Sequence, residues 1–151
     1  MSLKRVQHWP VLLDAYLRRA QELSFVWGEH DYCLFVSGWI NICTGVDPAE
    51  SWRGKYKSLP SALHLAGVRD CYNLGDIAQK AATQYGIPSC LPKMAGRGDI
   101  VLFKSNTFEG IGHTLGIVDT NLIYSPGIEC LQTVPLANVW NSAQTKAWKI
   151  G

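Results

Sequence analysis

Cys33 stands where a loop containing Gly28 gives way to an apolar helix, in the stretch EHDYCLFV at residues 29–36. The first turn of a helix offers free N–H groups and a positive dipole end, which can lower a thiol pKa to roughly 3.5–7.5 and make the sulfur nucleophilic. Such a thiol also needs a base, and His113, at the start of a β-prone run, could supply one. The plainer interpretation, a core thiol and an unrelated loop histidine, is favoured by the residues alone.

Other polar residues allow weaker chemical interpretations. Asp99, in GRGDIVLF, could orient a histidine, although an aspartate after glycine at a strand start is more often a turn residue. His30 and Cys33 have helical spacing and could form half of a metal site, but no second ligand pair stands out. We therefore predict no metal and no cofactor, and we expect His8 and His64 to be surface histidines or histidines with satisfied hydrogen bonds.

The bulk composition limits the classes of protein. With 151 residues and 47% hydrophobic residues, the chain should form one domain over residues 1–151 with its own core. A formal charge of +2 is too small to indicate nucleic acid, so the segment WRGKYKS (residues 52–58) is expected to be a solvated loop or an edge strand and not a single-strand binder. An amphipathic N-terminus predicts no signal peptide and no membrane span, and hence a soluble protein made in the cytoplasm.

Cysteine usage indicates neither a disulfide framework nor a zinc knuckle. The number of cysteines is odd, their spacing is wide, and no C-x-x-C pair occurs. We expect most of them to be small buried hydrophobic residues. They are Cys33, Cys43, Cys71, Cys90 and Cys130.

Hydrophobic periodicity and turn residues predict helices first and strands second. An amphipathic N-terminal helix falls within residues 1–24, with Leu13, Leu17, Ala20 and Leu23 on its apolar face. A central helix follows from an Asp31 N-cap to about Cys43. After an exposed connection, the remaining expected elements are helices at 60–67 and 74–85 and strands at 97–103, 113–118, 121–125, 129–134 and 146–150. This order implies an α+β domain, with the helices packed on a small, mostly antiparallel sheet formed by the C-terminal half.

The order of motifs resembles a known family. Asp31, Cys33 and Phe35 open the apolar helix, and the GDIVLF and LGIV strands follow. This order is similar to that of the NlpC-type cysteine peptidases of the papain-like superfamily, with D-C-S-G-F-V, G-D-L-V-F-F and H-V-G-I-Y. Residues 25–150 resemble still more closely a phage tail-associated branch with WG-x-x-D-C-C-L-F, RG-x-Y-R and AW-x-I. The matching stretches here are residues 27–35, 53–57 and 147–150.

The resemblance implies an NlpC-like fold whose catalytic residues have been replaced. The family's nucleophile, base and third polar residue fall on Tyr32, Thr114 and Tyr124. Cys33 comes one residue late, which rotates its side chain by about 100° on a helix, and His113 comes one residue early, which reverses its face on a strand. Asp31 and Asp99 would then support the cleft. A bulge near residues 110–112 with a shift in helix phase would restore a Cys33–His113 pair.

Three functional hypotheses follow from the resemblance. The favoured one is a phage or prophage tail-tip or baseplate subunit with a structural or interaction role, made in the bacterial cytoplasm, built into the virion and contacting other tail proteins. The alternative is an active cysteine peptidase or amidase that cleaves peptidoglycan stem peptides, with Cys33 as nucleophile and His113 as base. The third is a binding module that holds a cell-wall fragment or a tail protein in a cleft lined by Tyr32 and Tyr124.

Overall fold

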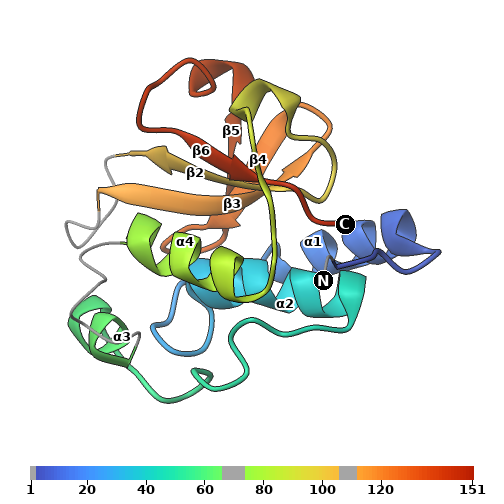
Figure 1. The fold of residues 1–151 in the computed structure, drawn as a ribbon. Coiled ribbons are helices and arrows are strands. Elements are labelled where there is room, and N and C mark those ends of the chain that lie inside the picture. The colour runs from blue at the N-terminus through green and yellow to red at the C-terminus, as the bar shows by residue number, and fades with distance from the viewer. Residues whose placement is uncertain (1–2, 66–73, 106–111) are drawn as a thin grey trace.

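The computed structural model describes residues 3–65, 74–105 and 112–151, and of Leu59 and Leu63 it describes the backbone alone. Within these described residues, four α-helices come first (Figure 1). Their bounds are α1 (Trp9–Ala20), α2 (Tyr32–Thr44), α3 (Leu59–Leu65) and α4 (Leu74–Gln84). The predicted glycine stop of α3 at Gly67 lies outside the described residues.

The second half of the chain forms a six-stranded sheet in the order β1-β6-β2-β3-β4-β5, in which every neighbouring pair is antiparallel. The predicted α+β class is therefore confirmed. The strands are β1 (Ser89–Cys90), β2 (Ile100–Lys104), β3 (His113–Asp119), β4 (Leu122–Pro126), β5 (Leu131–Pro135) and β6 (Lys146–Trp148). Short 3₁₀ turns, η1 (Pro92–Met94) and η3 (Leu136–Asn138), lie between strands.

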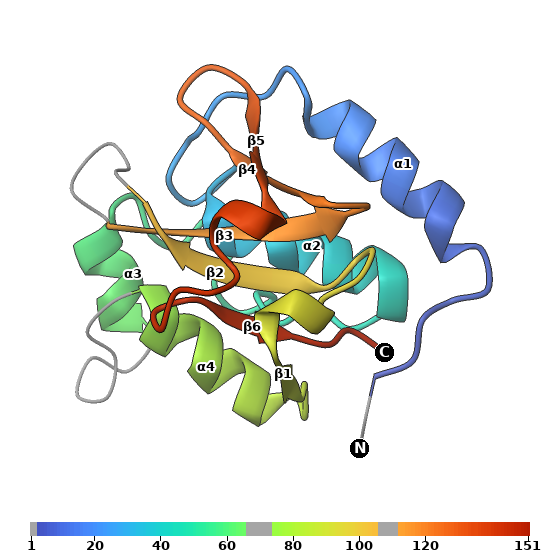
Figure 2. The ribbon, with the colours of Figure 1, turned by 90° about the horizontal axis from the view of Figure 1, so that it is seen from above.

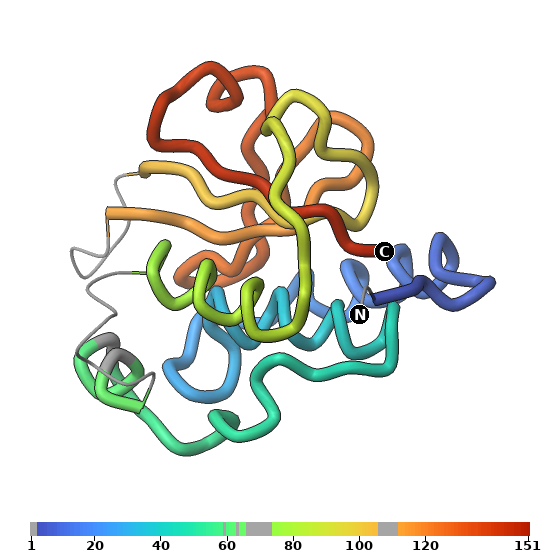
Figure 3. Tube along the Cα trace, in the orientation of Figure 1, coloured from blue at the N-terminus to red at the C-terminus, as the bar shows by residue number. Residues whose placement is uncertain are grey.

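Strand β1 was not predicted from the sequence. The chain leaves the C-terminus of α4 and runs up to the edge of the sheet (Figure 3), where Ser89 and Cys90 pair with Trp148 and Ala147 of β6. Two residues are too few for a hydrophobic alternation to show, so this strand depends on its partner.

Helix α2 lies at the centre of the helical layer. The side chain of Asp31 caps its first turn by accepting a hydrogen bond from Leu34 N, and Gly45 ends it in the left-handed conformation at φ 82°. Both ends were predicted. The helix buries residues on more than one face because α1 covers one side while the sheet covers another (Figure 2).

Helix α1 is amphipathic, with Leu13, Leu17 and Ala20 buried as predicted. It ends three residues earlier than the Leu23 periodicity indicates, and Leu23 is 48% exposed. The carbonyl of Gln21 instead accepts a hydrogen bond from Leu131 N of β5, so a contact with the sheet turns the chain away.

The core has two main parts, one on each face of the sheet. Ile100, Leu115 and Ile117 face the helices and join α1, α2 and α4 in the larger cluster. Val101, Phe103 and Val118, which alternate with them along the same strands, face the smaller cluster beneath η3. The site therefore lies on the helix-bearing face.

The N-terminal segment is tied to the C-terminus through Arg5 and Asp99. The Arg5 guanidinium donates to Ile150 O at 2.5 Å and to Asp99 Oδ1 at 2.9 Å. Asp99 is fully buried and also accepts from the backbone N–H of Gly96 and Ile150. The two ends of the chain accordingly lie side by side (Figures 1 and 2).

Across residues 3–65, 74–105 and 112–151, no helix has both the length and the apolar character needed to cross a membrane.

Candidate functional site

A buried hydrogen-bond network centred on Asp31 fixes the start of α2. Its carboxylate accepts from Gly28 N and Leu34 N, each at 2.9 Å, and from the Tyr56 hydroxyl at 2.5 Å. Gly28 has φ +80°, and a Cβ there would lie 2.0 Å from the Tyr56 carbonyl oxygen. The Trp27-Gly28 and Arg53–Lys57 motifs thus meet at one carboxylate, whose visible role is to hold the loop against the helix.

Tyr56 also corrects the expectation that the whole of WRGKYKS is solvated. The side chain is 4% exposed, whereas Arg53, Lys55 and Lys57 are exposed as predicted. Burial, followed by the nearby Asp31 carboxylate, raises the pKa of the Tyr56 phenol, which therefore donates its proton to Asp31.

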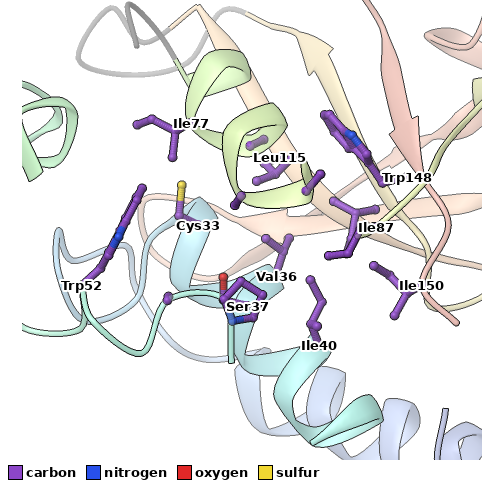
Figure 4. Close-up of a pocket in the computed structure, with 16 residues that line it drawn as sticks. Cys33, Val36, Ser37, Ile40, Trp52, Ile77, Ile87, Leu115, Trp148 and Ile150 are labelled. Atoms are coloured by element: carbon purple, nitrogen blue, oxygen red, sulfur yellow. The ribbon is translucent and has the colours of Figure 1, made fainter. Parts of the chain in front are cut away.

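Cys33 follows on the first turn of α2 but does not have the surroundings of a nucleophile. Its sulfur points between Trp52 and Ile77 into an apolar pocket (Figure 4). Burial raises the pKa of the thiol well above its ordinary value, and the Asp31 carboxylate raises it further. The favourable helix end is thus outweighed by desolvation and a neighbouring negative charge, so the thiol is held protonated at neutral pH.

Tyr32 occupies the position that matches the family nucleophile, and it is a core residue with 1% exposure. Its ring packs edge-on against Phe25, with centroids 5.1 Å apart. Its hydroxyl is buried and makes no full hydrogen bond to any described residue. Burial raises the pKa of Tyr32, and a weaker interaction with the Thr114 side chain lowers it in part.

Thr114 and Tyr124 stand at the other two matching positions. Thr114 is fully buried, and its hydroxyl lies 2.5 Å from that of Ser105. Tyr124 lies on β4 opposite Ile117 and packs against the helix-side cluster that contains Tyr32. Thr114 therefore lies by Tyr32 at the start of α2, whereas Tyr124 lines a separate hollow with Leu17 and Gln21.

His113 opens β3 opposite Lys104 and is half-buried. Strand alternation gives it the face of Leu115 and Ile117, opposite to that of Thr114, whose side chain interacts with Tyr32. No hydrogen bond joins His113 to Cys33 within the part of the chain that the structure describes. The predicted bulge at Gly110 and Ile111 lies outside that part.

Asp99 stands at the opposite end of the β2–β3 pair from His113. Val118 N donates to the Asp99 carbonyl, whereas His113 pairs with Lys104, five residues farther along β2. At roughly 3.3 Å per residue this separation is about 16 Å. Asp99 is therefore out of reach of the histidine and serves the contact with Arg5.

His30, whose spacing from Cys33 allows the two to form half of a metal site, is half-buried. Its ring contacts Phe35 edge-on at 5.8 Å, and its Nε2 atom is buried without a hydrogen-bond partner. Burial lowers the pKa of His30, although Asp31 raises it in part. Among the residues with described placement, no three His, Cys, Asp or Glu side chains gather as metal ligands. His8 and His64 are exposed, as predicted.

The cysteines differ from the expected buried set. Of the four that the structure describes, Cys43 is buried, Cys33 and Cys90 are half-buried and Cys130 is exposed, all as free thiols. Cys71 lies outside the described residues. Cys130 is exposed because it sits in the turn between β4 and β5, where its carbonyl accepts from Gly127 N.

These features define an α+β domain in which the start of a central helix is locked to a loop and faces an antiparallel sheet. Residues 4–150 match the family described as Domain of unknown function (DUF6950), and the chain belongs to that family. Neither the curated proteins nor the solved structures contain a match to the chain.

Proposed function

We propose that the chain is a non-catalytic, NlpC-like domain that serves as a structural or interaction subunit of a phage tail, at its tip or baseplate. The proposed role in a phage tail comes from the motif resemblance. The observation that carries the loss of catalysis is at the start of α2, where Tyr32 fills the nucleophile position and the neighbouring Cys33 thiol has a raised pKa.

Cysteine-dependent hydrolysis needs a thiolate, a base within hydrogen-bond reach and access for the substrate carbonyl. Tyr32 is 1% exposed, and Thr114 cannot act as a base near neutral pH. Both residues instead contribute to the packing between α2 and the sheet. A fold kept without its reacting groups suits a role in assembly.

The remaining family motifs support the same role. Asp31, Gly28 and Tyr56 join the helix start to the loop after α2, and Arg5 and Asp99 join the two ends of the chain. These contacts hold the loop after α2 and the two chain ends in place, which suits a subunit of a multiprotein assembly.

The alternative, an active cysteine peptidase or amidase, is favoured by one observation. His113 shares a sheet face with Leu115, which lines the same pocket as Cys33. For catalysis, the His113 side chain would have to reach the thiol and offset the rise in its pKa.

Hydrolysis of purified peptidoglycan tests the choice. We expect no release of stem peptides by the intact chain and no difference between that chain and the Cys33→Ala variant. Hydrolysis that both Cys33→Ala and His113→Ala abolish would establish the alternative.

Complementation tests the tail role. In a phage or prophage that carries the gene, deletion should remove infectious particles, and the chain should be found in purified tails. We expect Cys33→Ala and His113→Ala to restore infectivity, whereas Asp31→Ala, which disrupts the helix start, should not. Normal particles without the gene would contradict the proposal.

A further inference from the structure

An apolar pocket beside Cys33 opens between α4 and the loop after α2. Its mouth is formed by partly exposed residues, and its floor by buried ones on α2 and the sheet (Figure 4). The mouth residues are Cys33, Trp52, Ala78 and Ala81, and the floor includes Val36, Ile40, Ile87, Leu115 and Trp148. The walls therefore offer dispersion contacts and almost no hydrogen-bonding groups.

The size of the pocket limits what it can hold. Its cavity volume is about 60 Å³, less than half of the roughly 150 Å³ of an apolar cavity that holds benzene. A group of three or four carbon atoms fits this space, whereas an aromatic ring or a long acyl chain does not. Branched aliphatic side chains have the matching size and chemistry.

The loop on one side of the mouth, residues 45–58, carries three basic and two acidic residues. Lys55 N donates to Trp52 O at 3.0 Å, which places Lys55 next to the pocket wall. Lys55 and Lys57 are exposed and have no salt bridge with a described residue, whereas Arg53 is paired with Asp47. Glu50 is the acidic residue of this loop without such a partner. A segment that approaches the mouth gains from negative charge.

We propose that this pocket binds an acidic peptide segment of a partner protein, which inserts one branched aliphatic side chain between Trp52 and Ile77. The inference rests on the proposed interaction role and names the partner chemistry of the domain. The aliphatic side chain supplies burial, and Lys55 and Lys57 attract its acidic neighbours.

Titration with short blocked peptides tests the pocket on the full chain. The first peptide carries leucine between two pairs of glutamates, the second has glycine for the leucine, and the third has lysines for the glutamates. Methyl NMR signals of Ile77 and Leu115, which line the pocket, are the readout. We expect saturable shifts with the first peptide and at least about tenfold weaker binding of the second, the loss expected for burying one leucine.

Variants of the chain locate the binding. Ala81→Leu fills the mouth and should abolish the methyl shifts, whereas Gln84→Leu, an exposed residue on α4 outside the pocket, should leave them unchanged. Lys55→Glu combined with Lys57→Glu should weaken binding severalfold. Lys4→Glu combined with Lys93→Glu makes the same charge change at exposed positions elsewhere and should have little effect.

The proposal is overturned if the first peptide gives no saturable shift, if the leucine and glycine peptides bind equally, or if the lysine peptide binds as well as the glutamate peptide. These comparisons use the unaltered chain, so they do not depend on the folding of a variant. Cleavage of a peptide in the same samples would count against the non-catalytic role. The binding curves would still decide whether the pocket holds the peptide.

Discussion

Asp31 is the residue on which the start of α2 depends. Its buried carboxylate accepts three hydrogen bonds, one from the helix and two from the loops on either side. The aspartate of the D-x-C motif therefore has a structural reason to be present even where no catalysis occurs. Its partner Tyr56 lies in the motif at residues 53–57. Both residues of this contact therefore belong to motifs that the sequence shows.

We predict that Asp31→Ala lowers the free energy of unfolding by about 3 kcal/mol, because the helix loses its N-cap and a buried phenol and amide lose their acceptor. Urea denaturation measures the change. Asp47→Ala is the matched control, since Asp47 also accepts a backbone N–H, from Ala49, but is only partly buried. If Asp31→Ala lowered the free energy of unfolding no more than Asp47→Ala, the hydrogen-bond network around Asp31 would be unimportant for stability.

Tyr16 should make the free energy of unfolding depend on pH in the alkaline range. Burial raises its pKa from 10.0 to about 12, and its hydroxyl donates to Phe35 O at 2.6 Å. Because the folded-state pKa is the higher one, the stabilisation is complete below pH 10 and is lost as the pH rises through about 12. We expect Tyr16→Phe to lose less stability than the parent chain between pH 10 and 12 in urea denaturation. Parallel pH profiles of the two proteins would exclude this role.

The packing of α1 on α2 requires a glycine. A Cβ on Gly38 would lie 2.5 Å from the Tyr16 hydroxyl oxygen, so the absence of a side chain lets the phenol cross α2. We predict that Gly38→Ala destabilises the chain by about 1–2 kcal/mol, because the clash exceeds the gain in helix propensity.

A double-mutant cycle with Tyr16→Phe checks the cause. Removing the hydroxyl removes the atom that the new methyl group meets, so Gly38→Ala should be neutral or stabilising in the Tyr16→Phe background. Equal effects in both backgrounds, measured by urea denaturation, would mean that the clash is elsewhere.

Helix α2 could be predicted at both ends because its signals are local. Asp31 caps it, and Gly45 supplies the left-handed residue that ends it. The end of α1 and strand β1 could not be predicted, since each depends on hydrogen bonds to distant segments, from Leu131 to Gln21 and from β1 to β6. Local periodicity carries no information about such partners.

The candidate site was predictable only in part. Counting from Phe35 placed Tyr32 at the nucleophile position, and its burial follows from the apolar character of α2. The pocket around Cys33 and the unpartnered Nε2 of His30 arise where α2 meets other elements, and no local pattern indicates them.

The domain as a whole is closed by the contact between its two ends. Asp99 is fully buried and meets Arg5, whose side chain is 15% exposed, and Lys149, whose side chain is 46% exposed. We predict a loss of about 3 kcal/mol in unfolding free energy for Arg5→Ala, since a buried carboxylate loses its main partner. Lys149→Ala should cost less than about 1 kcal/mol, because the exposed pair is screened by water. Equal losses for the two variants would contradict this assignment.

The reactivity of Cys33 tests the loss of catalysis most directly. Alkylation by iodoacetamide, followed by mass spectrometry of the Cys33 peptide from pH 6 to 10, gives the pH dependence of its thiolate, with the exposed Cys130 as an internal reference. We predict that Cys33 reacts more slowly than Cys130 at neutral pH and that its rate is still rising above pH 9, since burial and Asp31 both raise its pKa. Rapid modification with a midpoint below pH 7.5, abolished by His113→Ala, would show an activated nucleophile and contradict the account.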